Sequence, residues 1–234
     1  MNINQAAEGG VAAVDRAVVI LRAMSSSSTP ISLADLARAT GLYKSTLLRI
    51  IESLEKASLV AKRADGAYVL APFAYQLGRA YEATHHLSDV LKPLLADLVA
   101  AGTESASFHV YDGVQTRLCL LRINSLHSTL DRIDVGDVLP LSRGAAGKLI
   151  TSFRRAGHTP SISNISAVSL GERDPSCAAV AVAVFGPGNE LMGALSMSGP
   201  KERFTTKAVA RMTKLGVAAA AKATAMLGGQ WPKA

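Results

Sequence analysis

The sequence predicts an α+β protein with an N-terminal winged helix-turn-helix, a connecting helix and a C-terminal domain built on an antiparallel sheet. Three observations support this fold class. Apolar residues recur with a helical period early in the chain, an Asp-Gly turn signal follows at Asp65 and Gly66, and the period changes to two after residue 105. The 234 residues are 49% hydrophobic, which is enough for one large or two small packed domains.

Two helices are expected before residue 41. The first covers residues 14–24 and ends at the polar run over residues 25–30. Its apolar face consists of Val14, Ala17, Val18 and Leu21. The second helix begins after Ser32, because Ser32 and Asp35 have the spacing of an N-terminal capping pattern. It ends at Gly41, since glycine tolerates the left-handed conformation of a sharp turn.

A third helix is expected over residues 43–56. Its apolar face is Leu47, Ile50, Ile51 and Leu54. Its first turn carries polar and cationic side chains, most of which point away from that face. In a helix-turn-helix, the N-terminal residues of this helix meet base edges in the major groove, and its free N–H groups favour phosphate.

A β-hairpin follows the third helix. Residues 59–70 alternate around Asp65 and Gly66, a strong signal for two short strands. Lys62 and Arg63 lie on this hairpin, where a wing can meet the DNA backbone or minor groove, and Arg16 and Arg22 on the first helix can add phosphate contacts. The candidate DNA-binding residues are Arg16, Arg22, Tyr43, Lys44, Ser45, Thr46, Arg49, Lys62 and Arg63.

The charge balance agrees with a polyanion partner. Lysine and arginine outnumber aspartate and glutamate by 25 to 18, for a net charge of +7. Such a balance favours nucleic acid first and an anionic membrane surface second. A protein-binding winged helix remains the alternative, and Tyr43 has a second interpretation as a hydrophobic staple.

The C-terminal half combines helices with strands. Helices are expected over residues 72–86, 87–101, 144–155 and 206–227, with Pro93 as a possible kink. Strands are expected over residues 105–110, 117–123, 130–135, 178–185 and 191–197. Ser196 and Ser198 alternate with Leu195 and Met197, so both hydroxyls lie on one face of their strand. If that face is buried, the hydroxyls need partners.

The sequence argues against an enzyme. Residues 142–149 differ from a phosphate-binding loop, because Ser142 and Leu149 stand where glycine and Ser or Thr are required. Cys119 and Cys177 form neither a disulfide framework nor a zinc motif, and no metal or cofactor is expected. The adjacent His85 and His86 are interpreted as a surface joint. No signal peptide or membrane span is indicated, so a cytoplasmic location is expected.

Four stretches of the first half, residues 14–22, 33–42, 44–49 and 68–72, resemble the IclR family of bacterial regulators. Residues 135–141 with 145–148, and residues 193–200, are similar to the two signature stretches of that family's effector domain. Tyr43 stands where the family usually has proline, a residue that presets the first turn of a helix.

The resemblance implies a DNA-binding domain over residues 11–71, a linker helix over 72–86, and a GAF-like effector-binding and oligomerisation domain over 87–229. It implies a homodimer or tetramer that represses or activates a catabolic operon by binding double-stranded operator DNA. The implied effector is a small carboxylic or aromatic acid. The implied effector contacts are Leu141, Gly144, Ala145, Cys177, Ala179, Ser196 and Ser198.

One departure from the family concerns the effector site. Only about thirty residues, 149–178, fill a gap that usually holds a longer helical insertion forming part of the pocket rim, and residues 159–166 read as a serine-rich loop. Effector binding is therefore either retained in altered form or lost. The second possibility gives the alternative function, a winged-helix interaction and dimerisation module with a non-functional pocket.

Overall fold

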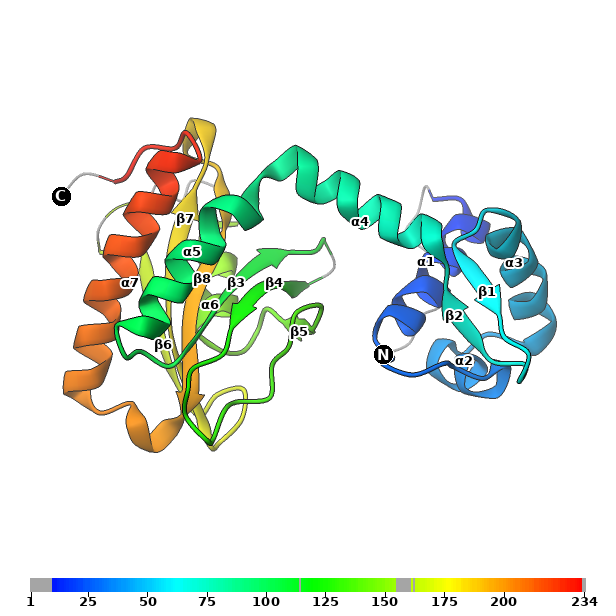
Figure 1. Cartoon of the computed structure of the whole chain (residues 1–234), viewed down its shortest axis with the longest axis horizontal. Coiled ribbons are helices and arrows are strands. Elements are labelled where there is room, and N and C mark those ends of the chain that lie inside the picture. The colour runs from blue at the N-terminus through cyan, green and yellow to red at the C-terminus, as the bar shows by residue number, and fades with distance from the viewer. Residues whose placement is uncertain (1–9, 114, 155–160, 162, 233–234) are drawn as a thin grey trace. The chain divides into compact units, whose positions relative to one another are not determined.

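The computed structural model describes residues 10–113, 115–154, 161 and 163–232, and the chain divides into two compact units, residues 1–85 and 86–234 (Figure 1). The first unit holds four helices and a two-stranded sheet in its described part. These elements are α1 (Ala12–Ser25), α2 (Leu33–Thr40), α3 (Lys44–Lys56), β1 (Val60–Lys62), β2 (Tyr68–Leu70) and α4 (Pro72–His85). β1 and β2 pair antiparallel around the Asp65-Gly66 turn, as the sequence predicts.

Local sequence signals explain the ends of α2. The Ser32 hydroxyl accepts a hydrogen bond from the Asp35 N–H at 3.1 Å and donates one to the Asp35 carboxylate at 2.7 Å. This reciprocal cap satisfies an N–H group that otherwise lacks a helical partner. At the other end Gly41 adopts φ 69°, the left-handed conformation that stops the helix and turns the chain toward α3.

The core of the first unit differs from the apolar face expected for α1. Ile20 and Met24 are buried against Leu36, Leu47 and Ile51, whereas Val14 is 58% exposed and Val18 44% exposed. α1 is apolar on more than one side, so a helical period alone does not select the buried face. The exposed side of α1 borders a groove of about 630 Å³ beside α3.

The second unit is a six-stranded antiparallel sheet in the order β5-β4-β3-β8-β7-β6, with helices on both faces. Its strands are β3 (Ser105–Tyr111), β4 (Thr116–Ile123), β5 (Val138–Pro140), β6 (Ser166–Leu170), β7 (Cys177–Phe185) and β8 (Leu191–Pro200). Its helices are α5 (Leu87–Ala100), α6 (Ala145–Phe153) and α7 (Thr206–Met226), and two short 3₁₀ turns, Pro187–Asn189 and Lys201–Arg203, flank β8.

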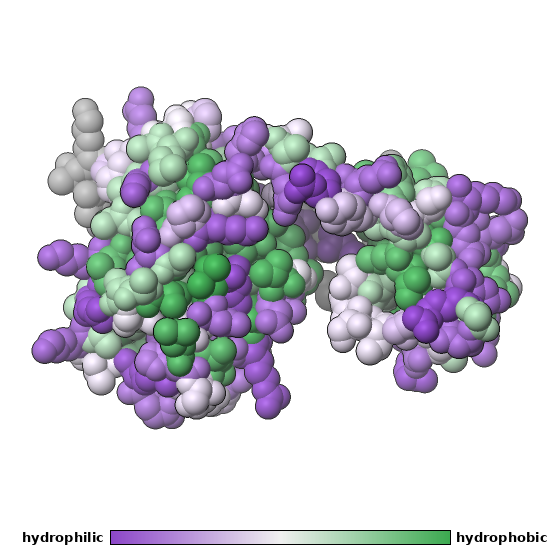
Figure 2. Space-filling model, in the orientation of Figure 1, coloured by the Kyte–Doolittle hydropathy of each residue, from purple (hydrophilic) through white to green (hydrophobic). Residues whose placement is uncertain are grey.

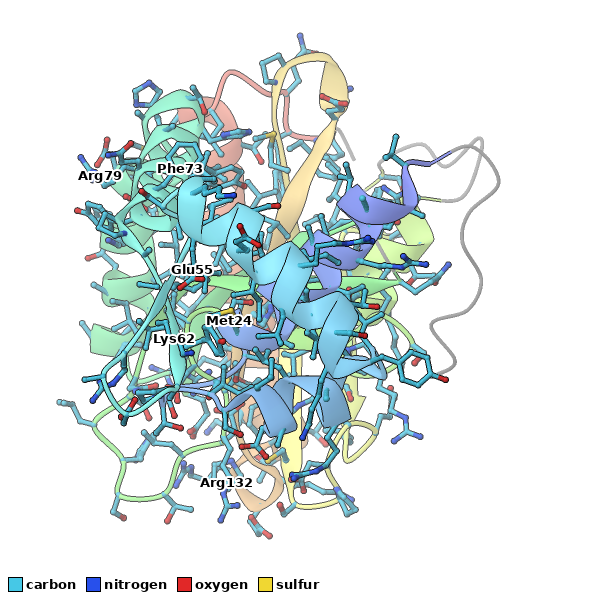
Figure 3. The ribbon with its side chains drawn as sticks, turned by 90° about the vertical axis from the view of Figure 1, so that its right-hand side faces the viewer. Met24, Glu55, Lys62, Phe73, Arg79 and Arg132 are labelled. Atoms are coloured by element: carbon cyan, nitrogen blue, oxygen red, sulfur yellow. The ribbon has the colours of Figure 1, made fainter. Side chains whose placement is uncertain are left out.

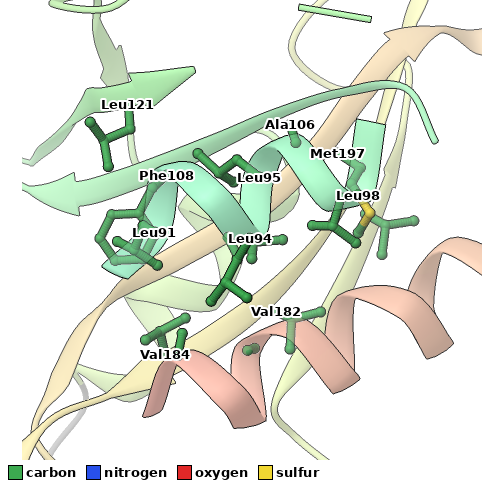
Figure 4. Packing of buried hydrophobic residues seen from close by; sticks show 14 of the residues in the cluster. Leu91, Leu94, Leu95, Leu98, Ala106, Phe108, Leu121, Val182, Val184 and Met197 are labelled. Atoms are coloured by element: carbon green, nitrogen blue, oxygen red, sulfur yellow. The ribbon is translucent and has the colours of Figure 1, made fainter. Parts of the chain in front are cut away.

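Strand alternation divides the sheet residues between two cores. Val180, Val182 and Val184 face α5 and α7 together with Phe108 and Met197 (Figure 4). The intervening Ala181, Ala183 and Phe185 face α6. Because one strand supplies alternate side chains to each layer, a polar residue next to an apolar one in β3 or β8 lies on the α6 side.

One strand expected for the second unit is wrong. Residues 130–135 form no strand; the edge strand is β5 instead. Aspartates in that stretch explain the difference, because Asp131 is buried in ion pairs and the Asp137 carboxylate accepts from the Asp134 N–H. The described residues of the expected serine-rich loop before Ser166 form turn or loop backbone, and Ser166 begins β6, an unpredicted strand that pairs with β7. The rest of that expected loop, residues 159, 160 and 162, lies outside the described residues.

Candidate nucleic-acid interface and effector cavity

The first turn of α3 is exposed. Tyr43 is the N-cap residue, with φ −65° and ψ 144°, and among the described residues its side chain makes no capping hydrogen bond. Its ring is 84% exposed, and Lys44, Ser45 and Arg49 are exposed as well, with Thr46 half-buried. The N–H groups of this turn thus face outward beside a cation, an arrangement that favours phosphate.

The buried face of α3 fixes the direction of its polar side chains. Leu47, Ile51 and Leu54 anchor the helix in the core, which leaves Arg49 on the outer surface. Arg49 also borders the groove beside α1, where Arg16 is another bordering residue. Two candidate DNA-binding cations from different helices therefore line the same groove. Arg22, in the last turn of α1, is exposed too.

The wing carries two cations in different settings, of which Lys62 is labelled in Figure 3. Lys62 Nζ lies 5.9 Å from the centre of the Tyr68 ring. Arg63 Nε donates to the Asp65 carboxylate at 3.2 Å. The Ala67 N–H hydrogen bond and the Arg63 charge lower the pKa of Asp65. Arg63 is thus partly neutralised within the wing, whereas Lys62 keeps its charge available.

A small cavity lies in the second unit between the first turn of α6 and the polar face of the sheet. Its volume is about 20 Å³, a scale that holds roughly one water molecule. Six of the seven residues expected to bind an effector line it. These are Gly144, Ala145, Cys177, Ala179, Ser196 and Ser198. The seventh, Leu141, is buried instead in the hydrophobic cluster beneath α6.

The Ser198 hydroxyl already has a protein partner. It donates to the Asp131 carboxylate at 2.8 Å. Asp131 also pairs with Arg122 at 2.6 Å and with Arg173 at 3.6 Å, and its side chain is fully buried. Strand alternation on β8 predicts that a buried Ser198 hydroxyl needs a hydrogen-bond partner. The Asp131 carboxylate is that partner.

Arg117 is a buried cation on the cavity wall. The residue is 3% exposed, and its Nη1 donates to the carbonyl groups of Arg143, at 3.0 Å, and Pro140. Among the described residues, its Nε has no hydrogen-bond partner. Burial and the nearby charge of Arg173 lower the pKa of Arg117 to about 10. The cavity wall thus contains a guanidinium that carbonyl oxygens only partly satisfy.

His109 is the second ionisable group in the wall. It lies on β3, is 2% exposed, and its Nε2 is 3.0 Å from the Ser107 hydroxyl. Within the described part of the chain, its Nδ1 has no partner. Burial, followed by the charges of Arg117, Arg122 and Arg173, lowers the pKa of His109 to about 3. The imidazole is therefore neutral near pH 7 and has one nitrogen left for a hydrogen bond.

Sequence reasoning missed several residues of the cavity. The additional lining residues are His109, Arg117, Ile133, Ala146, Ser169, Arg173 and Ala178. Alternation in β3 could have placed His109 on the polar face, because Ser105 and Ser107 share its parity. Arg117 gave no such signal, since a single arginine at a strand end is usually exposed. Ser169 was missed because no strand was predicted over residues 167–170.

Neither a metal site nor a membrane helix is found in the described part of the chain. No group of three or more His, Cys, Asp or Glu side chains there could hold a metal ion. In the same residues, no helix is long and apolar enough to cross a bilayer.

Sequence similarity agrees with this arrangement. A family model described as the IclR helix-turn-helix domain matches residues 13–64. The transcriptional repressor IclR of Escherichia coli is 21% identical over 253 residues, covering 95% of this chain and 92% of that protein. The transcriptional regulator TtgV of Pseudomonas putida is 33% identical over 150 residues, but the match spans only 64% of this chain and 56% of that protein.

Solved structures share the fold. A putative IclR regulator from Silicibacter superposes with a TM-score of 0.81 at 22% identity, covering 94% of this chain and 98% of the other. An IclR homologue from Microbacterium hydrocarbonoxydans, complexed with 4-hydroxybenzoate, superposes with a TM-score of 0.72 at 16% identity, covering 91% and 99%.

The helix-turn-helix with its hairpin is a DNA-binding domain of the IclR type, and a separate α+β unit with a buried cavity accompanies it. Over most of its length the chain is similar to transcriptional regulators of the IclR family.

Proposed function

We propose that the chain binds operator DNA through α3 and the β1-β2 wing, and that a small organic acid in the cavity changes this binding. The exposed first turn of α3, inside the segment that matches the IclR helix-turn-helix model, carries the proposal. Arg49 and Ser45 point away from the core, toward a major groove, and Lys62 reaches the neighbouring backbone. Acting on DNA places the protein in the bacterial cytoplasm.

The effector part of the proposal depends on the donors around the cavity. The N–H groups at the start of α6 favour an anion, and Ser196 lies on the opposite wall. The similar protein from Microbacterium is complexed with 4-hydroxybenzoate, an aromatic acid. A cavity of about 20 Å³ is too small for such a molecule, so binding must select a wider conformation. This coupling gives an effector a means to change the protein's state.

Exposed apolar side chains support the assembly of the chain into a homodimer. A tetramer built from two such dimers would also bury these side chains. Val14 and Val18 on α1, and Leu77 and Tyr81 on α4, are each more than one-third exposed, and apolar residues are visible at the surface of both units (Figure 2). Apolar patches of this kind mark association surfaces. Two recognition helices in one dimer would read two half-sites about one helical turn apart.

Binding to promoter fragments tests the proposal. The full-length protein is titrated against labelled duplexes from the promoters of the genes beside its own, with a shuffled duplex as control. We expect specific retention, with an affinity that falls steeply as salt rises because phosphate contacts release counterions. If no fragment binds more tightly than the shuffled duplex at low salt, the alternative function, a protein-interaction module, replaces this one.

A further inference from the structure

The cavity region holds more positive than negative charge. Three guanidinium groups, those of Arg117, Arg122 and Arg173, act on the neutral His109, but only one carboxylate, that of Asp131, pairs with any of them in the described residues. The carboxylate of Glu172, the residue before Arg173, forms an ion pair with Lys148. The charge of Arg173 also acts on Asp174, but the three arginines exceed their one ion-paired carboxylate by two charges.

The excess charge is buried, which makes it costly. The Arg122 side chain is 3% exposed and that of Arg173 21% exposed, and Arg117 is 3% exposed. A buried cation is stable only when it is paired or fully hydrogen-bonded. Carbonyl groups accept from Arg117 Nη1 but carry no net charge, and among described residues Arg117 Nε and Arg122 Nη1 lack partners.

The two cations on the cavity wall meet beside the start of α6. A Cβ atom at Gly144 would lie 3.3 Å from Arg117 Nη2 and 3.9 Å from the Arg173 Cβ. The turn before α6 is therefore adjacent to the Arg117 guanidinium and to the base of the Arg173 side chain, whose charge acts on Arg117. The N–H groups at the start of α6 and the Ser196 hydroxyl can bind one carboxylate. The guanidinium groups of Arg117 and Arg173 provide forked donors for a second carboxylate.

We infer that the effector is a small organic dianion with two carboxylates, and that Arg117 is the residue that selects it over a monocarboxylate. This inference rests on the proposed effector function of the cavity. A monocarboxylate leaves one of the two excess charges uncompensated, whereas a dicarboxylate neutralises both. Arg173 is the more exposed of the two lining cations, so the ligand enters past its side chain and displaces it from Asp131.

Matched pairs of acids test the inference with the full-length protein. The pairs are succinate with butyrate, glutarate with valerate, and phthalate with benzoate, at equal ionic strength. Binding is followed by isothermal titration and by the thermal shift, because a ligand of the native state raises the melting temperature. The single tryptophan, Trp231, packs against Phe185 in the second unit, so its fluorescence reports that unit.

We expect at least one dicarboxylate to bind about tenfold or more tightly than its partner, which corresponds to about 1.4 kcal/mol. Arg117→Met should remove this preference, because it weakens dicarboxylate binding more than monocarboxylate binding. Arg117→Lys keeps the charge but loses the forked donor, and should retain part of the preference. If neither variant folds, the comparison of matched acids on the unaltered protein still decides whether the cavity prefers a dicarboxylate.

The other outcomes separate the two proposals. A monocarboxylate that binds as tightly as its dicarboxylate overturns the inference and leaves the proposed effector function standing. If no acid of the panel binds, both the inference and the effector function fail, while DNA binding is judged separately. Inorganic phosphate or sulfate binding as tightly as the best dicarboxylate would overturn the requirement for two carboxylates.

Discussion

Nη1 of Arg117 donates a hydrogen bond to the backbone carbonyl of Arg143 at 3.0 Å. This contact joins β4 to the turn before α6, and it depends on the absence of a side chain at Gly147. A Cβ atom at Gly147 would lie 2.5 Å from the Leu141 carbonyl oxygen and 2.8 Å from Arg117 Nη1. The close approach of helix, turn and arginine therefore requires glycine at position 147.

Gly147→Ala should lower the free energy of unfolding of the second unit. The new methyl group must displace a backbone carbonyl and a buried guanidinium, so we expect a loss of about 1–3 kcal/mol. Urea unfolding followed by Trp231 fluorescence measures the change, since this tryptophan packs on Phe185 of β7.

The matched control is the same substitution in a helix with open space. Nothing lies within 4 Å of a Cβ atom at Gly78 in α4. Gly78→Ala should therefore raise the stability of the first unit by about 0.5–1 kcal/mol, because alanine loses less backbone entropy in a helix. Far-UV circular dichroism follows this variant. Equal effects of the two substitutions would contradict the crowding at Gly147.

His109 should make the second unit less stable as the pH falls. Its pKa is about 3 in the folded protein, below the ordinary value of 6.5. Between these values the unfolded chain binds a proton that the folded protein excludes, so stability present near pH 7 decreases toward pH 3. At about pH 5 the loss is about 2 kcal/mol.

His109→Gln isolates this contribution. The variant keeps a polar side chain near Ser107 but does not titrate. We expect the unaltered protein to lose about 2 kcal/mol more than the variant between about pH 7 and about pH 5, measured by urea unfolding with Trp231 fluorescence. The carboxylates with lowered pKa, such as Asp65 and Asp174, contribute equally to both proteins. Identical pH dependence would show that His109 does not resist protonation in the fold.

The helix-turn-helix was predictable because its signals are local. The Ser32 cap, the Gly41 turn and the Asp65-Gly66 hairpin each depend on residues within a few positions, and all three form as expected. The buried face of α1 was not predictable from its period, because that helix is apolar on several sides. Val14 fits a helical stripe as well as Ile20 does, and only the packing of α2 and α3 selects Ile20.

The cavity was predictable only where strands alternate. Ser196 and Ser198 could be assigned to one face from their parity, but the partner of Ser198 could not. Asp131 comes from a segment 67 positions away that reads as a strand and folds as a loop. Arg117 could not be found for a similar reason: its burial results from the carbonyl groups of the turn before α6, which tertiary folding alone brings to it.

Arg49→Ala should abolish specific operator binding without unfolding the first unit. The side chain is exposed on the outer face of α3, so its removal should change stability by less than about 0.5 kcal/mol. Loss of one base or phosphate contact costs about 1–3 kcal/mol, and a dimer loses two such contacts. Fluorescence anisotropy with the operator fragment measures the affinity.

Lys214→Ala is the matched control for charge. Lys214 is exposed on α7 in the second unit, and its removal changes the net charge of the chain by the same amount. We expect operator affinity within about twofold of the unaltered protein at moderate salt, because Lys214 lies outside the DNA-binding unit and salt screens charges that do not contact the DNA. If both variants weaken binding equally, general charge attraction explains the effect and α3 does not lie in the groove.

Tyr43→Pro should separate the structural role of this position from its contact with DNA. Tyr43 has φ −65°, the angle that proline imposes, and among the described residues its N–H has no hydrogen-bond partner. Proline should therefore raise the stability of the first unit by about 0.5 kcal/mol by restricting the unfolded chain, as far-UV circular dichroism can measure.

Substitutions at Tyr43 should change operator affinity in a different direction from the stability of the first unit. The Tyr43 ring is 84% exposed at the start of α3, where it can contact the sugar-phosphate backbone or a base edge. Tyr43→Ala and Tyr43→Pro should both weaken operator binding several-fold, to a similar extent, although only proline stabilises the fold. If Tyr43→Pro binds as tightly as the unaltered protein and Tyr43→Ala does not, the position acts by ordering the first turn of α3, and the phenol makes no contact with DNA.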